Sequence, residues 1–174
     1  MADNDVVTTQ AADGYSQAQL ADALWQFSVA FYPSQQPLLL RLQDEYQANI
    51  NICLCICWLS LQQRQLTETQ LNQIITAIAP VNQHVTQPLR QIRRQLTAET
   101  LPLKPALLAA ELQAEQQEQL RIAEVLAHCW LQLVPLRDSA WHTYFVSAPA
   151  LQPLLVDLDQ AIRAYTPSRG ETLI

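Results

Sequence analysis

The chain has 174 residues and a mass of 19.7 kDa, with 49% hydrophobic and 15% charged residues, which suits one folded domain. Its formal net charge is -6 and its pI is near 4.9, so binding to nucleic acid or to an anionic membrane is disfavoured as its main task. It has only two glycines, Gly14 and Gly170, and a glycine-free interior excludes phosphate-binding loops, dinucleotide-binding turns, nucleophile elbows and EF-hand loops.

The terminal segments and the cysteines favour a cytoplasmic protein. Because the first residues are polar and acidic, we expect residues 1–15 to be disordered, residues 16–165 to form one helical domain and residues 166–174 to form a tail. No signal-peptide pattern opens the chain, and the longest apolar run, residues 52–61, is about half of what spans a bilayer. The cysteines are not spread over loops as in disulfide-rich secreted proteins, so reduced thiols are expected.

Two amphipathic helices are predicted in the first third of the chain. Ser16 and Gln19 have the capping-box arrangement that satisfies free amides at a helix start, and apolar residues follow at helical spacing to about residue 32. Pro33 is expected to end this helix, because proline disfavours helical backbone in the residue before it. Ser34 can then cap a second helix.

The next segment, Ile50–Leu61, is apolar on every side and predicts a central buried helix. A buried strand is the alternative, since its cysteines, Cys53, Cys55 and Cys57, alternate with other apolar residues. A strand would have no partner, because no glycine or hairpin signal lies nearby. On a helix, Cys53 and Cys57 share one face and Cys55 points away. We therefore expect the cysteines to pack in the core and predict no metal site.

Proline and capping residues divide the remainder into further helices. Thr67 opens a capping box that predicts a helix ending at Pro80, and Thr86 is expected to cap the next helix. A long helix is predicted over about 106–133, and a last helix after Ser147. The expected fold is all-α, a single-domain bundle of six to seven helices with proline-marked connections.

One basic cluster lies on a single predicted helix face: Arg90, Arg93 and Arg94. Three guanidinium groups that close repel each other unless an anionic group meets them. The polar middle of the long helix offers carboxylates at matching spacing: Glu111, Glu115 and Glu118. If the two helices are neighbours, these charges form an interhelical network. A site for an anion or an acidic partner, and a solvated face, are the alternatives.

Other polar and aromatic residues give weaker signals. Trp25 lies off the apolar stripe of its helix, so it could mark a contact surface. Gln43, Asp44 and Glu45 are neighbours on a helix and do not converge as paired catalytic carboxylates would. His142, four residues after Asp138, is interpreted as a structural residue because no activated nucleophile accompanies it.

Four ordered strings resemble a family of proteobacterial proteins known as domain of unknown function 2390. The strings are LWQFSVAFY (24–32), LQDEYQANIN (42–51), PLRQIRRQL (88–96) and ELQAE (111–115). The family pattern has glycine where this chain has Gln47, and Leu or Phe at the three clustered cysteines, which fits a packing role. The resemblance implies a small bacterial cytoplasmic protein with no assigned activity. It draws attention to ten residues: Trp25, Ser28, Gln43, Asp44, Asn51, Arg90, Arg93, Arg94, Glu111 and Glu115.

Taken together, the sequence favours a non-enzymatic accessory or adaptor protein that binds another protein. The alternative is a domain, possibly enzymatic, that binds a small anionic ligand in a pocket lined by Arg and Glu, and a third possibility is a homo-oligomer formed through the last helix. No catalytic residue, metal or cofactor is predicted. The candidate ligand- or partner-binding residues are Arg90, Arg93, Arg94, Asp44, Gln43, Trp25, Glu111 and Glu115.

Overall fold

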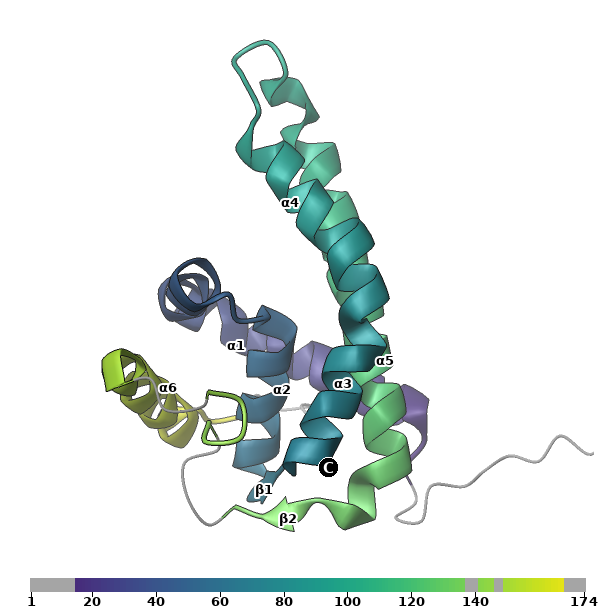
Figure 1. Ribbon diagram of the computed structural model, residues 1–174, viewed down its shortest axis with the longest axis vertical. Coiled ribbons are helices and arrows are strands. Elements are labelled where there is room, and N and C mark those ends of the chain that lie inside the picture. The colour runs from purple at the N-terminus through teal and green to yellow at the C-terminus, as the bar shows by residue number, and fades with distance from the viewer. Residues whose placement is uncertain (1–14, 137–140, 146–148, 168–174) are drawn as a thin grey trace, which may run out of the picture.

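The computed structural model describes residues 15–136, 141–145 and 149–167 (Figure 1). The α-helices in these ranges are α1 (Gln17–Tyr46), α2 (Ile50–Leu61), α3 (Glu68–Val81), α4 (Gln87–Arg94), α5 (Lys104–Cys129) and α6 (Gln152–Ala164). Short 3-10 turns cover Leu101–Leu103, Trp130–Gln132 and Pro149–Leu151. The two-residue strands β1 (Arg64–Gln65) and β2 (Val134–Pro135) pair antiparallel. The predicted all-α class is confirmed. The expected N-terminal disorder and most of the expected tail fall on residues 1–14 and 168–174, outside these ranges.

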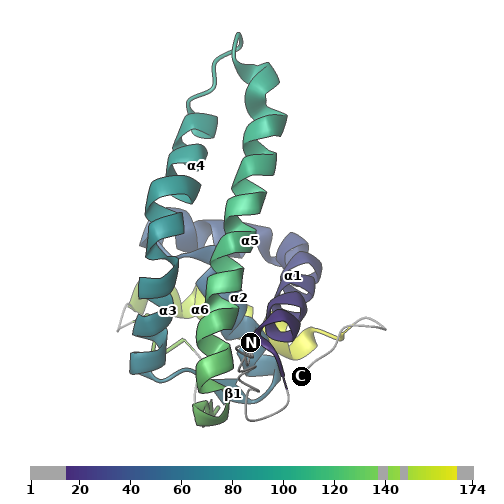
Figure 2. The same cartoon turned by 90° about the vertical axis from the view of Figure 1, so that its right-hand side faces the viewer.

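The predicted break at Pro33 is wrong. Helix α1 continues through Pro33 and Pro37 to Tyr46, and Ser34 is not a helix cap, because its Oγ donates to the carbonyl of Phe31 over 3.0 Å. Each proline removes one backbone hydrogen bond and its ring crowds the preceding turn, which bends a helix without ending it. Accordingly, α1 changes direction along its course (Figures 1 and 2).

The break expected at Thr86 is wrong as well. Helix α3 continues into α4 through one π-helical turn, η1 (Asn82–Thr86), in which the N–H of Gln87 bonds to the carbonyl of Asn82. Pro88 has no N–H to bond to the carbonyl four residues earlier, and the wider π turn accommodates its ring. With the two breaks absent, the described residues form five continuous helices, fewer than the six to seven predicted.

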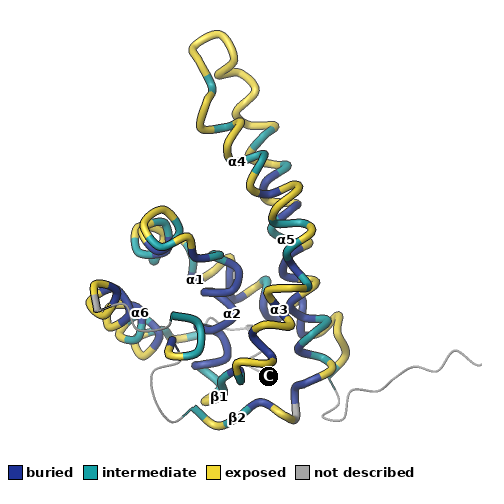
Figure 3. The backbone as a smooth tube through the Cα atoms, viewed as in Figure 1, coloured by how far each residue is buried: buried dark blue, intermediate teal, exposed yellow. Residues whose placement is uncertain are grey.

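These helices form a body and a projecting arm. The continuous helix α3–η1–α4 runs antiparallel to α5, and the two make a long hairpin (Figures 1 and 2). The α3 half of this hairpin lies against the body, whereas the half with α4 and the start of α5 projects from it (Figure 1). Figure 3 shows that the end of the projecting half is mostly exposed. Helix α1 passes beside α5, so the arm and α1 form two walls of a corner (Figure 2).

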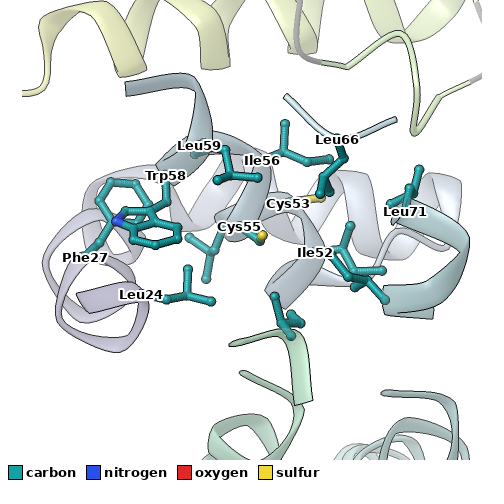
Figure 4. Packing of buried hydrophobic residues seen from close by; sticks show 14 of the residues in the cluster. Leu24, Phe27, Ile52, Cys53, Cys55, Ile56, Trp58, Leu59, Leu66 and Leu71 are labelled. Atoms are coloured by element: carbon teal, nitrogen blue, oxygen red, sulfur yellow. The ribbon is translucent and has the colours of Figure 1, made fainter. Parts of the chain in front are cut away.

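Helix α2 is the centre of the core, since its residues from Asn51 to Ser60 are all buried. Cys53, Cys55 and Cys57 all belong to this core together with Trp58. Figure 4 shows the side chains of Cys53, Cys55 and Trp58 within it. Burial raises the pKa of these three thiols, so they stay protonated and pack as small apolar groups. The predicted buried helix is thus confirmed, and the alternative strand is ruled out.

The turn between α1 and α2 contains a residue with a left-handed backbone. Gln47 ends α1 with φ 57° and ψ 25°, a conformation that glycine adopts without the steric cost of a Cβ atom. The turn matters because it sets the direction in which α2 leaves α1.

Replacing Gln47 by Gly should therefore raise the free energy of unfolding by about 0.5–1 kcal/mol, because the left-handed conformation then carries no Cβ clash. Urea denaturation followed by circular dichroism measures this. Gln47→Ala is the matched control, since it keeps the Cβ atom and should give no gain. An equal gain in both variants would show that the side chain, and not the backbone conformation, is responsible.

Candidate functional site

A cavity of about 530 Å³ lies in the corner between α1 and the α4–α5 hairpin, and the start of α2 contributes to its wall. Its lining includes residues of α1 from Trp25 to Asp44, residues of α4, and residues of α5 from Leu108 to Gln119. All eight residues selected from the sequence line this one cavity: Trp25, Gln43, Asp44, Arg90, Arg93, Arg94, Glu111 and Glu115. The fold therefore brings them together, and their role in binding stays a prediction.

Two of the arginines are paired with carboxylates of α5. Arg93 contacts Glu111 with two nitrogens, Nε to Oε1 over 2.5 Å and Nη2 to Oε2 over 3.2 Å. Arg90 Nη2 lies 3.1 Å from Glu115 Oε1. This two-point geometry fixes the plane of the Arg93 guanidinium. The interhelical network that the sequence suggested is present for these four residues, and it joins α4 to α5.

The third arginine reaches across to α1. Arg94 Nη2 lies 2.6 Å from Asp44 Oδ1, and both side chains are about half exposed, at 51% and 50%. The hydrogen bond from Arg94, together with one from Gln43, lowers the pKa of Asp44. The bond to Asp44 is the one hydrogen bond that Arg94 makes within the described part of the chain. Water screens such an exposed pair, so another anion can replace Asp44 at low cost.

The surroundings of the Glu115 carboxyl group disfavour its charged form. Burial is the main cause that raises its pKa; the nearby Glu118 and Glu111 add to this effect, and Arg90 opposes it. The neutral form of Glu115 is therefore closer to being populated than that of an ordinary glutamate. Protonation of Glu115 would leave the cavity with more positive than negative charge.

Glu118 does not face the arginines as the sequence suggested. Its side chain is fully buried, at 0% exposure, and accepts four hydrogen bonds from neutral donors. Asn49 Nδ2 and Asn51 Nδ2 donate to Oε2 over 2.8 and 3.0 Å, and Asn82 Nδ2 and Thr86 Oγ1 donate to Oε1 over 3.1 and 2.5 Å. Every lone pair in the plane of the carboxylate therefore has a donor.

The local structure explains how these donors converge. Asn49 is the N-cap of α2, with its Oδ1 accepting from the N–H of Ile52, so its Nδ2 is free to turn to Glu118. The first turn of α2 adds the positive end of the helix dipole near the same carboxylate. Asn82 and Thr86 stand four residues apart in the π turn and face α5 together. The side chain of Thr86 was expected to cap a helix, but it donates its hydrogen bond to Glu118.

Sequence reasoning missed Gln119 as a cavity residue. Its side chain is 2% exposed, and its Nε2 donates to Ser28 Oγ over 2.9 Å and to Asn51 Oδ1 over 3.0 Å. The family strings drew attention to Ser28 and Asn51, but the matching string on α5 ends at Glu115. A polar residue four positions beyond Glu115, on the same helix face, was the available signal.

The cavity has an apolar side and a polar side. The apolar lining comes from α1, α2 and α5, and it comprises Trp25, Val29, Leu40, Ile50, Leu54, Leu108 and Leu112. A second, smaller cavity of about 300 Å³ shares with the first the charged residues Asp44, Arg90, Arg94 and Glu115. The pairs Arg94–Asp44 and Arg90–Glu115 thus lie between two hollows.

The other candidates for chemistry are not gathered into a site. Within the ranges that the structure covers, no group of three or more His, Cys, Asp and Glu side chains could hold a metal ion. His142 is exposed, and its suggested partner Asp138 lies outside the described residues. A helix long and apolar enough to cross a membrane is likewise not found in those ranges.

Comparison with known proteins identifies the family. The chain belongs to the family described as protein of unknown function (DUF2390), whose model matches residues 23–122. The match extends from α1 into α5 and covers all eight residues selected from the sequence. The resemblance noted from the sequence strings is confirmed. No curated protein and no solved structure matches the chain.

The buried carboxylate leads to a test of stability. Glu118→Gln should lower the free energy of unfolding by about 2–4 kcal/mol, because an amide has one acceptor oxygen and its NH₂ group would face two other donors. Chemical denaturation measures the loss. Glu124→Gln is the control on the same helix, because Glu124 pairs with Arg121 at the surface, and its loss should stay below about 0.5 kcal/mol. Similar small losses in both variants would contradict the role given to Glu118.

Proposed function

We propose that this protein binds a small organic anion in the cavity between α1 and the α4–α5 hairpin. The observation that carries the proposal is the convergence of three arginines, Arg90, Arg93 and Arg94, on one cavity of about 530 Å³. Cavities of this size are typical of small-molecule sites, which combine apolar walls with a few polar groups that orient the ligand. The cavity in this chain has both an apolar wall and polar groups.

Arg94 is the residue best suited to contact the anion. It is half exposed, and its bond to Asp44 leaves most of its guanidinium N–H groups available. A ligand carboxylate or phosphate can replace Asp44 there, with a bidentate contact that the single Asp44 bond lacks. Arg90 and Arg93 are already oriented by Glu115 and Glu111, so little side-chain freedom is lost when a ligand enters.

The apolar side of the cavity supports a ligand with a hydrocarbon portion. Trp25, Val29 and Leu112 line it, and Val29 and Leu112 have substantial surface exposed to water. Covering that surface with hydrocarbon would release water from it, which stabilises a complex in proportion to the apolar area buried. A purely polar anion would leave this part of the cavity wet.

The proposal assigns binding and no reaction. The ionic groups that line the cavity are paired with each other, and Ser28 Oγ, a lining hydroxyl, donates to the carbonyl of Leu24 over 2.8 Å. A serine whose proton is bonded to a backbone carbonyl has no base to activate it.

Native mass spectrometry of protein purified gently from cells tests the proposal. The intact protein is expected to carry an added mass that is released on denaturation as an organic acid or phosphate. Arg94→Ala should weaken binding of that compound at least about tenfold, because one charge-assisted contact is lost. Arg121→Ala, in a surface pair away from the cavity lining, is the control and should leave binding unchanged. A released compound that binds both variants equally would contradict the site.

A protein partner is the second candidate, and the projecting arm favours it. Exposed apolar side chains gather there on α4, the following turn and the start of α5: Ile92, Leu101, Leu103, Leu108 and Leu112. An apolar surface on a projecting hairpin is a common form of protein contact site. This observation supports the accessory or adaptor role that the sequence favours. Association of two copies through the last helix stays a prediction.

Partner capture with a matched pair of variants tests this role. Leu103→Glu changes a side chain that is 56% exposed on the arm, and Val156→Glu changes one that is 48% exposed on α6. If the arm binds a partner, cross-linking in cells should lose one specific protein with Leu103→Glu and retain it with Val156→Glu. A partner that survives Leu103→Glu would exclude this surface, and one lost in Val156→Glu alone would point to α6.

A further inference from the structure

One wall of the cavity contains an acceptor atom without a donor. Gln119 Oε1 is buried and has no hydrogen-bond partner among the described residues, although its side chain lines the cavity. The other end of the same amide is fully engaged, with Nε2 donating to both Ser28 Oγ and Asn51 Oδ1. Buried polar atoms are nearly always satisfied in folded proteins, so this one requires an explanation.

The orientation of the Gln119 amide is fixed by its neighbours. Ser28 Oγ donates its single proton to the carbonyl of Leu24, so towards Gln119 it can only accept. Asn51 Nδ2 donates to Glu118 Oε2 over 3.0 Å, so Asn51 also presents its oxygen to Gln119. If the Gln119 amide turned over, its oxygen would face two acceptor oxygens.

The orientation of Asn51 is fixed in turn by the negative charge of Glu118. If Asn51 turned over as well, its oxygen would face the carboxylate of Glu118, which accepts and does not donate. The carboxylate therefore sets the direction of the chain of hydrogen bonds from Asn51 to Gln119. Gln119 Oε1 is the last atom in this series of hydrogen bonds. Rotation of the Gln119 amide would not give it a donor, so it remains an acceptor.

We infer that the ligand carries a hydrogen-bond donor, an N–H or O–H group, that bonds to Gln119 Oε1. This inference rests on the proposed function and adds a second recognition group to the anion. Gln43 shows the same pattern, since its Nε2 donates to Asp44 Oδ1 over 3.2 Å and its buried Oε1 is unpaired in the described chain. Both carboxamide side chains are among the residues that line this cavity, and the oxygen of each is buried without a donor among the described residues.

The ligand class follows from the three features of the lining. An anionic group bonds to Arg94, an N–H or O–H group bonds to Gln119, and a hydrocarbon portion covers the apolar side formed by Trp25, Val29 and Leu112. N-acyl amino acids have all three features, because an amide N–H lies beside a carboxylate and an acyl chain. A hydroxylated fatty acid would offer the same chemistry with O–H as the donor.

A pair of probes that differ only in the substituent on the amide nitrogen tests the inference. N-octanoylglycine has the amide N–H, whereas N-octanoylsarcosine has a methyl group in its place and the same carboxylate and chain. Isothermal titration calorimetry should show that the wild-type protein binds N-octanoylglycine about tenfold more tightly, since the acceptor is already desolvated before binding. The ¹³C resonance of the Gln119 side-chain carbonyl should shift with N-octanoylglycine and stay in place with the sarcosine probe.

Two variants separate the donor contact from the anion contact. Gln119→Met should bring the ratio of the two probes' dissociation constants close to one. Arg94→Ala should weaken the binding of both probes and leave this ratio unchanged. The comparison of probes on the wild-type protein needs no variant, so it stands even if Gln119→Met fails to fold. Equal binding of the two probes, with Arg94→Ala weakening both, would overturn the donor contact and leave the proposed function intact. No binding of either probe at millimolar concentration would overturn both.

Discussion

The buried carboxylate of Glu118 is the interaction on which the architecture of the site depends. It sits on α5 and accepts hydrogen bonds from the turn before α2, from the first turn of α2 and from the π turn that precedes α4. The start of α2, the π turn before α4 and α5 are thereby held to one charged group. A buried charge that lacked these donors would be strongly destabilising, so the donors and the carboxylate require each other.

The charged residues of the site divide into two groups with different surroundings. Glu118 is surrounded by neutral amides and a hydroxyl, which hold it in place, and no arginine among the described residues pairs with it. Glu111 and Glu115 instead orient Arg93 and Arg90 along the cavity wall. Arg94, which is paired at one point with the exposed Asp44, is the cation that a ligand can reach most easily. Glu118 thus holds neighbouring segments together, whereas the arginines and the carboxylates paired with them give the cavity its pattern of charges.

The sequence predicted most of the helices and the charged residues that line the candidate site, because local patterns determine both. Capping boxes at Ser16 and Thr67, the apolar segment Ile50–Leu61 and the cluster around Arg93 are short-range signals, and each is found in the structure. The errors came from long-range effects. Helices were expected to end at Pro33 and Pro80, with new helices capped by Ser34 and Thr86, but packing and a π turn keep both helices continuous. The roles of Glu118 and Gln119 depend on residues more than thirty positions away, which spacing along one helix cannot show.

We propose that a fixed acceptor, Gln119 Oε1, and an accessible arginine, Arg94, recognise one ligand in one cavity. A high-resolution crystal structure of the protein purified without added ligand from its own cells tests this most directly. Electron density for a small molecule is expected in the cavity, with a donor atom about 3 Å from Gln119 Oε1 and an anionic group on Arg94. A cavity filled by rearranged side chains, or a Gln119 amide that bonds to a protein donor through its oxygen, would contradict it.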